Sequence, residues 1–294
     1  MTWRPAIKRP AATDEALAQD LLVDLGGHGP LLHLAHANGF PPGSYRRLAR
    51  ALADDYHLVA LPARPLWPGS RPAEALTWRP LADDLVRGLD ARGLAGIVGV
   101  GHSLGGVLTL WAALASRAGR PDLFRALVLI DPVILPRPWL WGLRLLRRLG
   151  LEEQQPLAQG ALHRRRTWPD RQACFDHYRA KAVFARWSDA ALWDYVESGT
   201  AVEAHGSVRL RYPPEWEAHI FGTVPLDIWR DVTRLRVPVL FLRGETSHTF
   251  RPGVLARLAH LLPHAATATI AGAGHLLPME KPDETAAAIR AFLK

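Results

Sequence analysis

The sequence contains little cysteine and no long apolar run. Cys174 is the only cysteine among 294 residues, so the chain can form neither an intrachain disulfide nor a cysteine-based metal cluster. No uncharged apolar stretch reaches the roughly 18 residues that a membrane-spanning helix needs. The first ten residues, Met1–Pro10, carry Arg4, Lys8 and Arg9 without an apolar run behind them, which argues against a secretory leader. These absences predict a cytoplasmic protein.

Basic residues outnumber acidic ones, which gives a net charge of +8 and an isoelectric point near 10.2. Such a surplus concentrates anions near the surface. The arginines are spread along the chain, with local clusters at Arg164–Arg166 and around Arg144–Arg148. No zinc-finger spacing, aromatic RNA-binding signature or DNA-reading motif accompanies them. We therefore predict a small-molecule substrate and no nucleic-acid partner, with no cofactor and no metal; the oligomeric state is left open.

Short apolar runs, each closed by a turn-forming or polar residue, alternate with longer segments of helical spacing. This alternation predicts an α/β fold with a mostly parallel sheet flanked by helices. The residues Leu21–Leu25 predict an antiparallel strand that leads into it. The predicted parallel strands are Leu31–Ala35, His57–Leu61, Gly96–Val100, Ala126–Ile130, Val237–Leu242 and Ala266–Ile270. The predicted helices are Gly43–Ala53, Pro80–Arg92, Leu104–Ala118 and Pro282–Leu293.

The alternation stops between about Pro136 and Pro225, where tryptophan, arginine and helical segments dominate and no buried strand is predicted. We interpret residues 136–225 as a helical cap inserted into a core made of residues 1–135 and 226–294. The inserted tryptophans suit a small core or a pocket lining, and internal packing is the simpler reading. They are Trp139, Trp141, Trp168, Trp187, Trp193 and Trp216.

One segment of the insertion, Trp139–Arg148, mixes apolar, aromatic and basic residues. A cap helix that buries its Leu and Trp side chains and exposes arginine explains this pattern, and we favour it. The alternative is an interfacial helix that makes weak contact with a membrane surface. Stable insertion into a membrane is not predicted.

The stretch Gly101-His102-Ser103-Leu104-Gly105 matches G-x-S-x-G, directly after an apolar strand and before an Ala- and Leu-rich helix. A sharp strand-to-helix turn of this kind strains the serine backbone and leaves no room for side chains two residues away. Ser103 is the predicted nucleophile. A dinucleotide-binding motif would need glycine where Leu104 stands, and no Lys-Ser or Lys-Thr follows as a phosphate-binding loop requires. A helix-capping serine in a glycine-rich turn is the remaining structural explanation.

Two further turns fit the same chemistry. His275 follows Gly272-Ala273-Gly274 after the last predicted strand, where a general base can reach the serine hydroxyl. The segment His36-Ala37-Asn38-Gly39-Phe40 ends the first parallel strand. The backbone N–H groups of Phe40 and Leu104 are the predicted donors of an oxyanion hole, and an ordinary Asn-Gly turn is the alternative for the first.

The motifs HANGFPPGSYRRLARAL, GHSLGG, ALVLIDPV, PVLFLRGE and AGAGHLLPMEKP together resemble the α/β-hydrolase superfamily, in its capped esterase-like branch. The resemblance covers about the first 135 and the last 60 residues. It implies Ser103 as nucleophile, His275 as base, Phe40 and Leu104 as oxyanion donors, and a cap that shapes the pocket. The sharp strand-to-helix turn that carries the nucleophile, called the elbow, has a serine here. The dehalogenase and epoxide-hydrolase branches carry an aspartate at that position.

The sequence departs from the family pattern where an aspartate usually follows the Val237–Leu242 strand. The run there is Arg243–Thr249 and contains no aspartate. The acid of the triad is therefore Glu245 or Asp131, and both satisfy the chain order Ser, acid, His. We predict Asp131, because it ends a strand at the edge of the sheet where functional groups gather and Pro132 stiffens the turn.

These residues predict a serine hydrolase that cleaves an ester, thioester or lactone through an acyl-enzyme intermediate. Two alternatives keep the fold. One is a carbon–carbon bond hydrolase or acyltransferase, and the other is a non-catalytic binding protein, which the missing aspartate suggests. Fold-level resemblance does not choose between them.

Overall fold

The computed structural model describes residues 21–115, 122–151 and 154–294. The segment Met1–Pro10 and the end of the helix predicted over Leu104–Ala118 lie outside these residues.

A seven-stranded sheet forms the centre of the molecule, in the order β1-β3-β2-β4-β5-β9-β10. Every neighbouring pair is parallel except β1 and β3, which are antiparallel. This confirms the predicted fold class. The strands are β1 (Val23–Asp24), β2 (Leu31–Ala35), β3 (His57–Ala60), β4 (Ile97–His102), β5 (Phe124–Ile130), β9 (Val239–Gly244) and β10 (Ala266–Ile270).

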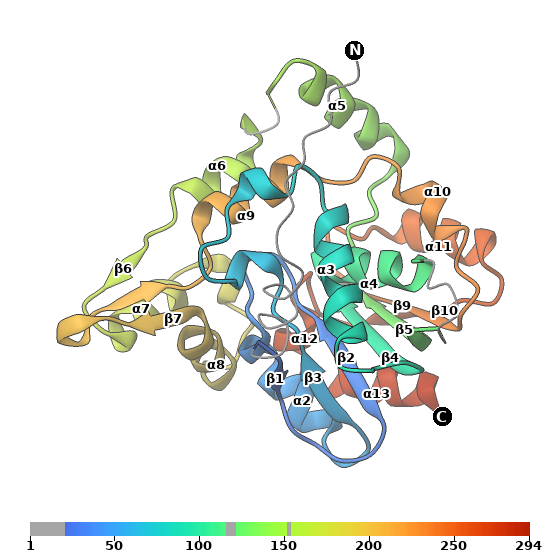
Figure 1. Ribbon diagram of the computed structural model, residues 1–294, viewed down its shortest axis with the longest axis horizontal. Coiled ribbons are helices and arrows are strands. Elements are labelled where there is room, and N and C mark those ends of the chain that lie inside the picture. The colour runs from blue at the N-terminus through green and yellow to red at the C-terminus, as the bar shows by residue number, and fades with distance from the viewer. Residues whose placement is uncertain (1–20, 116–121, 152–153) are drawn as a thin grey trace.

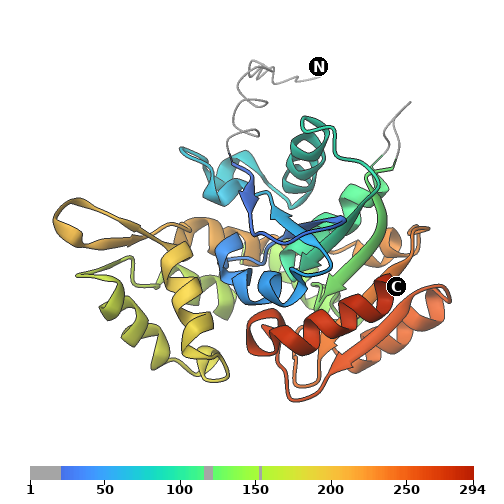
Figure 2. The ribbon, with the colours of Figure 1, turned by 90° about the horizontal axis from the view of Figure 1, so that it is seen from below.

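Helices cover both faces of this sheet (Figures 1 and 2). On one face lie α2 (Arg46–Leu52), α12 (Leu277–Glu280) and α13 (Pro282–Leu293). On the other lie α3 (Arg79–Asp90), α4 (Leu104–Leu114), α10 (Ile228–Val232) and α11 (Pro252–Leu261). Short 3-10 helices span Pro42–Tyr45, Arg64–Leu66, Pro72–Glu74, Ala182–Phe184 and Ala204–Gly206.

The central strands are mostly apolar and show no polar alternation, as expected for strands that are covered on both faces. All six residues of β4 and all six of β9 are buried. Parallel strands also end at a common edge, so the loops after β2, β4, β5, β9 and β10 converge there.

The inserted segment contains a second, small sheet that the sequence did not predict. Its three antiparallel strands lie in the order β6-β8-β7. The prediction that this helical segment contains no buried strand is therefore wrong. Strands of two or three residues are too short to show a period-two pattern. The elements here are α5 (Arg137–Arg148), α6 (Pro156–Leu162), β6 (Thr167–Trp168), α7 (Arg171–Arg179), α8 (Asp189–Gly199), β7 (Thr200–Val202), β8 (Val208–Leu210) and α9 (Pro214–Gly222).

The insertion is tied to the core by hydrogen bonds near the carboxyl edge of the sheet. Trp78 Nε1 donates to the carbonyl of Ile220 at 3.0 Å. Arg47 Nε donates to Asp194 Oδ2 at 2.7 Å, and that carboxylate is nearly buried. Figure 1 shows α6, α7, α8 and β6 on the opposite side of the molecule from α10 and α11.

Helix α5 does not bury its tryptophans as expected. Leu140 is its only buried residue, whereas Trp141 is 70% exposed. Arg144 and Arg147 turn inward and donate to backbone carbonyls of residues 222–226. The favoured assignment of arginine to solvent and tryptophan to the core is therefore wrong for these residues. Among the described residues no helix is long and apolar enough to cross a membrane.

Candidate active site

Ser103 lies at the turn between β4 and α4 with a backbone φ of 56° and ψ of −115°. A non-glycine residue adopts such a positive φ only under strain. A Cβ at Gly101 would lie 2.4 Å from the Gly105 carbonyl oxygen, and one at Gly105 would lie 2.0 Å from that of Ala35. The two glycines of the motif are therefore required by the close approach of neighbouring backbone, as the motif predicts.

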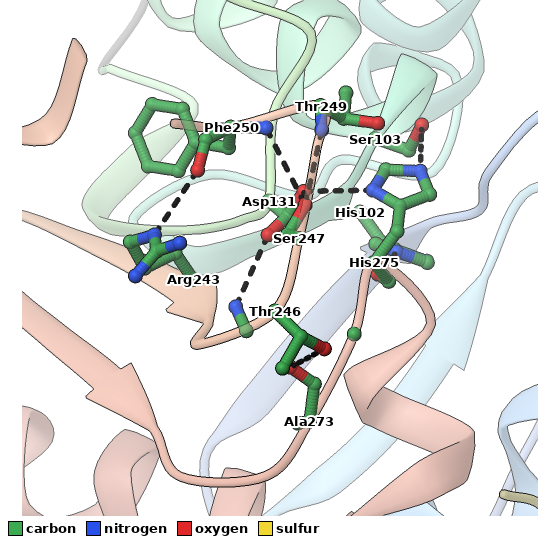
Figure 3. A network of polar contacts seen from close by, with 12 residues as sticks. His102, Ser103, Asp131, Arg243, Thr246, Ser247, Thr249, Phe250, Ala273 and His275 are labelled. Carbon is green, nitrogen blue, oxygen red and sulfur yellow. Dashed lines mark hydrogen bonds and ion pairs between the residues drawn. The ribbon is translucent and has the colours of Figure 1, made fainter. Parts of the chain in front are cut away.

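Ser103, His275 and Asp131 form one chain of hydrogen bonds (Figure 3). His275 Nε2 lies 3.0 Å from Ser103 Oγ, and its Nδ1 lies 2.7 Å from Asp131 Oδ1. Ser103 follows β4, Asp131 follows β5 and His275 follows β10. The ends of these three strands share one edge of the sheet. The structure thus brings together the three residues that the sequence proposed as a triad.

The carboxylate of Asp131 is completely buried and accepts three hydrogen bonds. Besides His275, the donors are the Ser247 hydroxyl at 2.6 Å and the Gly244 N–H at 3.1 Å. Together these donors fix the position of the carboxylate beside the imidazole. Asp131 also has a φ of 42°, and its own N–H donates to the Leu242 carbonyl at 2.7 Å.

Ser247 was not predicted from the sequence as part of the site. Its Oγ donates to Asp131 and accepts the N–H groups of Thr249 at 3.2 Å and Phe250 at 3.4 Å. Arg243 Nε donates to the Phe250 carbonyl at 3.0 Å and holds the same loop (Figure 3). The loop after β9, which lacks an aspartate, therefore still contacts the triad through a serine. The only sequence signal was a hydroxyl residue in that run.

Glu245 is exposed and points elsewhere. Its Oε2 accepts the N–H of Gly272 at 2.8 Å, which ties the loop after β9 to the loop after β10. Asp131 occupies the position beside His275 Nδ1 instead.

The expected oxyanion donor Phe40 is already used in the structure. Its N–H donates to the Ala37 carbonyl at 3.2 Å, across a turn in which Gly39 has a φ of +79°. These are the features of a type II turn, which requires a positive φ at its third residue. The Phe40 N–H is therefore engaged within this turn, and its role as an oxyanion donor stays a prediction from the sequence. The N–H of Asn38 makes no hydrogen bond to any described residue, and Leu104 begins α4, where N–H groups have no partner within the helix.

The side chain of Asn38 fixes this turn to the insertion. Its Nδ2 donates to the Glu217 carbonyl at 3.0 Å, and its Oδ1 accepts the Tyr212 hydroxyl at 2.9 Å. The Glu217 carboxylate is paired with Arg164, whose guanidinium also donates to the hydroxyls of Tyr178 and Tyr195. The insertion thereby helps to position the backbone next to Ser103.

Two buried histidines support the site from behind. His102 Nε2 lies 2.9 Å from the His275 carbonyl, and its Nδ1 lies 2.8 Å from the Tyr45 hydroxyl. Burial holds the pKa of His102 well below its usual value. Burial also lowers the pKa of His36 to about 4, and His36 Nε2 accepts the N–H of Ala63 at 3.0 Å. Both rings are therefore neutral near pH 7 and act as hydrogen-bonding supports.

Ser103 and His275 open onto a cavity of about 950 Å³ between the core and the insertion. Apolar side chains from α5, α6 and α9 make up much of its wall, among them Leu143, Leu146, Leu157, Ile220 and Phe221. Cavities of this size and character bind small organic molecules. Within the described ranges no group of three or more His, Cys, Asp or Glu residues is arranged to hold a metal ion.

The chain is similar in sequence to several known enzymes. The chain is 28% identical over 272 residues to polyketide synthase ThaQ of Burkholderia thailandensis. This match covers 91% of the present chain but only 12% of that protein. It is 27% identical to 2-(acetamidomethylene)succinate hydrolase of Mesorhizobium japonicum, with coverage of 91% and 89%. Esterase YbfF of Escherichia coli is 28% identical, with coverage of 84% and 86%.

Solved structures agree on the fold. The crystal structure of E-2-(acetamidomethylene)succinate hydrolase superimposes with a TM-score of 0.73 at 23% identity and covers 92% of this chain and 94% of that one. A thioesterase domain from the curacin biosynthetic pathway gives a TM-score of 0.70 at 18% identity, with the same coverage. The model of the alpha/beta hydrolase family matches residues 10–288. With the strand order, the elbow and this match, the chain belongs to the alpha/beta hydrolase family.

Proposed function

We propose that the protein is a serine hydrolase that cleaves an ester, thioester or lactone through an acyl-enzyme. The observation that carries this proposal is the chain of hydrogen bonds in which His275 lies 3.0 Å from Ser103 Oγ and 2.7 Å from Asp131 Oδ1. A base within hydrogen-bond distance of a hydroxyl, and itself oriented by a carboxylate, is the arrangement that activates a serine nucleophile.

In the proposed reaction, Ser103 Oγ attacks the substrate carbonyl while its proton moves to His275 Nε2. The tetrahedral intermediate collapses, and the leaving alcohol or thiol takes that proton. Water then attacks the acyl-enzyme and gives a proton to His275. As this second intermediate collapses, His275 returns the proton to Ser103 Oγ, and the carboxylic acid and the free serine are released. Asp131 holds the imidazole in one tautomer and stabilises its protonated form during both attacks.

We assign the oxyanion hole to the backbone N–H groups of Asn38 and Leu104. Both residues line the cavity beside Ser103. Neither N–H is committed to another described residue, whereas that of Phe40 is. The N-terminus of α4 adds its partial positive charge to the developing oxyanion.

The wall of the cavity favours a substrate with a sizeable apolar acyl group, because most of the surface near Ser103 is hydrocarbon. Relatives named as an esterase and as a hydrolase are consistent with acyl chemistry of this kind. The complete hydrogen-bond chain favours an enzyme over a non-catalytic binding protein. Location in the cytoplasm stays a prediction from the sequence.

A fluorophosphonate probe tests the proposal directly, since it reacts with activated serines. We expect one equivalent to attach at Ser103 in the wild type and none in Ser103→Ala, with labelling located by peptide mass spectrometry. A panel of p-nitrophenyl esters, acyl thioesters and lactones then identifies the bond cleaved. A folded wild-type protein that neither reacts with the probe nor hydrolyses any member of the panel would refute the assignment.

A further inference from the structure

A second cavity, of about 530 Å³, lies between the start of α5 and the start of α11. Its wall is formed by Pro136–Pro138, Trp229, Arg251–Val254 and Arg257. We call it the arginine cleft. None of the chemistry described above uses it.

The charged side chains that line this cleft are all basic. Arg137, Arg251 and Arg257 line it, and no acidic residue does. None of the three arginines forms an ion pair with any residue in the described part of the chain, although many other arginines do. Three guanidinium groups that have no ion-pair partner among the described residues surround one hollow and attract an anion, and phosphate matches their planar arrangement of donors.

Two of the guanidinium groups are held in place by aromatic rings. The guanidinium of Arg251 lies 5.0 Å from the centre of the Trp139 ring, and that of Arg257 lies 5.3 Å from the Trp229 ring. Trp229 is itself fixed, because its Nε1 donates to the Leu135 carbonyl at 2.8 Å. Stacking leaves the edge of a guanidinium free to donate hydrogen bonds. The side chains are thus partly ordered before any ligand binds.

The helix backbone adds to the positive electrostatic potential of the cleft. Helix α5 has 12 residues and α11 has 10, and the first turn of each contributes to the wall. Helix N-termini carry partial positive charge, although Pro138 and Pro252 have no N–H and the N–H groups of Trp139 and Val254 already donate to backbone carbonyls. A side chain at Gly253, in the first turn of α11, would meet nothing within 4 Å, so the space in front of this helix end is open.

The arginine cleft is next to the cavity of about 950 Å³ onto which Ser103 opens, which we call the acyl cavity. Trp139 lines the acyl cavity and stacks on Arg251 of the cleft. Two segments lead from the triad to the cleft: residues 131–136, which start at Asp131, and residues 247–251, which start at the Ser247 that contacts it. Their lengths limit the distance between the Cα atoms of Asp131 and Pro136 to about 18 Å, and between those of Ser247 and Arg251 to about 14 Å.

We propose that the arginine cleft binds a phosphate group carried by the leaving group of the substrate. The substrate is then a thioester whose thiol is a phosphorylated carrier, with the acyl chain in the larger cavity and the phosphate held by Arg137, Arg251 and Arg257. This inference rests on the proposed hydrolase function and narrows its substrate class.

The test compares two thioesters of the same acyl chain, one on coenzyme A and one on N-acetylcysteamine, which has no phosphate. In the variant Arg137→Gln/Arg251→Gln/Arg257→Gln, we expect KM for the coenzyme A thioester to rise about tenfold or more with kcat nearly unchanged. KM for the N-acetylcysteamine thioester should stay within about twofold, which also shows that the variant folds. Arg50→Gln, an exposed arginine of α2 on the other face of the sheet, is the matched control.

Binding gives an independent readout. Ser103→Ala should bind the coenzyme A thioester, measured by calorimetry, and the added arginine substitutions should weaken that binding by about tenfold or more. Inorganic phosphate should compete with the coenzyme A thioester in the wild type and not in the arginine variant. Sedimentation with phosphatidylglycerol vesicles tests a lipid headgroup as the other source of phosphate.

The outcomes separate the two proposals. If neither thioester is hydrolysed and no ester or lactone is either, the proposed function fails. If both thioesters are hydrolysed with the same KM and the arginine variant treats them alike, only the arginine cleft assignment is overturned. Vesicle binding that the arginine substitutions abolish, without any preference for the coenzyme A thioester, overturns the carrier assignment in favour of a lipid headgroup.

Discussion

His275 Nδ1 lies 2.7 Å from Oδ1 of Asp131 although 144 residues separate the two in the chain. The contact depends on an unusual backbone, because Asp131 has a φ of 42° directly after β5. Ser247 and the N–H of Gly244 hold the same carboxylate, so it is fixed from three sides. A carboxylate fixed in this way can orient an imidazole without moving during the reaction.

This contact predicts different effects at the two acidic candidates. Asp131→Asn should lower kcat by about a hundredfold or more, because the amide cannot hold His275 in the correct tautomer. Glu245→Gln should retain most activity, because its carboxylate binds the N–H of Gly272 and not the imidazole. Turnover and melting temperature are measured in parallel. A near-normal Asp131→Asn together with an inactive Glu245→Gln would move the acid to the loop after β9.

The serine and histidine should act as one unit. Ser103→Ala and His275→Ala should each reduce turnover by several orders of magnitude, and the double variant should be no slower than either alone. The reason is that every proton His275 moves belongs to a step in which Ser103 forms or loses its acyl group, so without Ser103 the imidazole has no role. Single-turnover assays on all three variants check this. Additive losses would mean that the two residues act in separate steps.

The arrangement of the core followed directly from the sequence, since buried parallel strands are continuous apolar runs closed by turn residues. Strands β2 and β10 occur with the predicted bounds. The short strands β6, β7 and β8 were missed because their two or three residues carry no measurable periodicity. Helix α5 was misjudged because its arginines reach carbonyls of residues 222–226, a long-range contact that periodicity does not report.

Local patterns located Ser103 and His275, because both depend on glycine turns next to strands. The oxyanion turn was harder to interpret, since the choice between the N–H groups of Asn38 and Phe40 depends on the φ of Gly39. Ser247 was missed because its role exists only once the loops after β5 and β9 meet. The arginine cleft likewise combines residues that lie more than a hundred positions apart.

Stability should fall in mild acid because of buried neutral histidines. Burial lowers the pKa of His33 to about 3 and of His36 to about 4, from 6.5 in the unfolded chain. Below pH 6.5 the unfolded chain takes up protons that the folded one refuses, so this stability is present above pH 6.5 and is lost as pH falls towards 4. Each histidine contributes a slope of about 1.4 kcal/mol per pH unit in that window.

Urea unfolding of the wild type and His36→Gln, at several values between about pH 7 and about pH 4.5, measures this effect. The variant removes the titrating ring and keeps an acceptor for the N–H of Ala63. We expect its stability to change less steeply with pH, by about one proton. Equal slopes for the two proteins would mean that His36 titrates normally in the fold.

Alanine substitutions at two glycines should have opposite effects on stability, because one glycine lies in the crowded turn at Ser103 and the other on an open helix surface. Gly105→Ala places a Cβ 2.0 Å from the Ala35 carbonyl oxygen, so the elbow must shift and both stability and turnover should drop sharply. Gly142→Ala in α5 meets nothing within 4 Å and should stabilise the protein by about 0.5–1 kcal/mol. Thermal unfolding compares the two. Normal activity in Gly105→Ala would contradict the required closeness of β2 and α4.

Backbone ester substitution distinguishes the two candidate oxyanion donors. Replacing the N–H of Asn38 by oxygen, with its side chain retained, removes the N–H that faces no described partner. We expect kcat to fall by about a hundredfold or more, the usual effect of losing one oxyanion donor, with little change in KM. The same replacement at Phe40 removes only the turn bond to Ala37 and should cost about 0.5–1.5 kcal/mol of stability. Its kcat should stay within severalfold of the wild type. If the Phe40 ester is the inactive one, the turn must open during catalysis and the donor assigned from the sequence is restored.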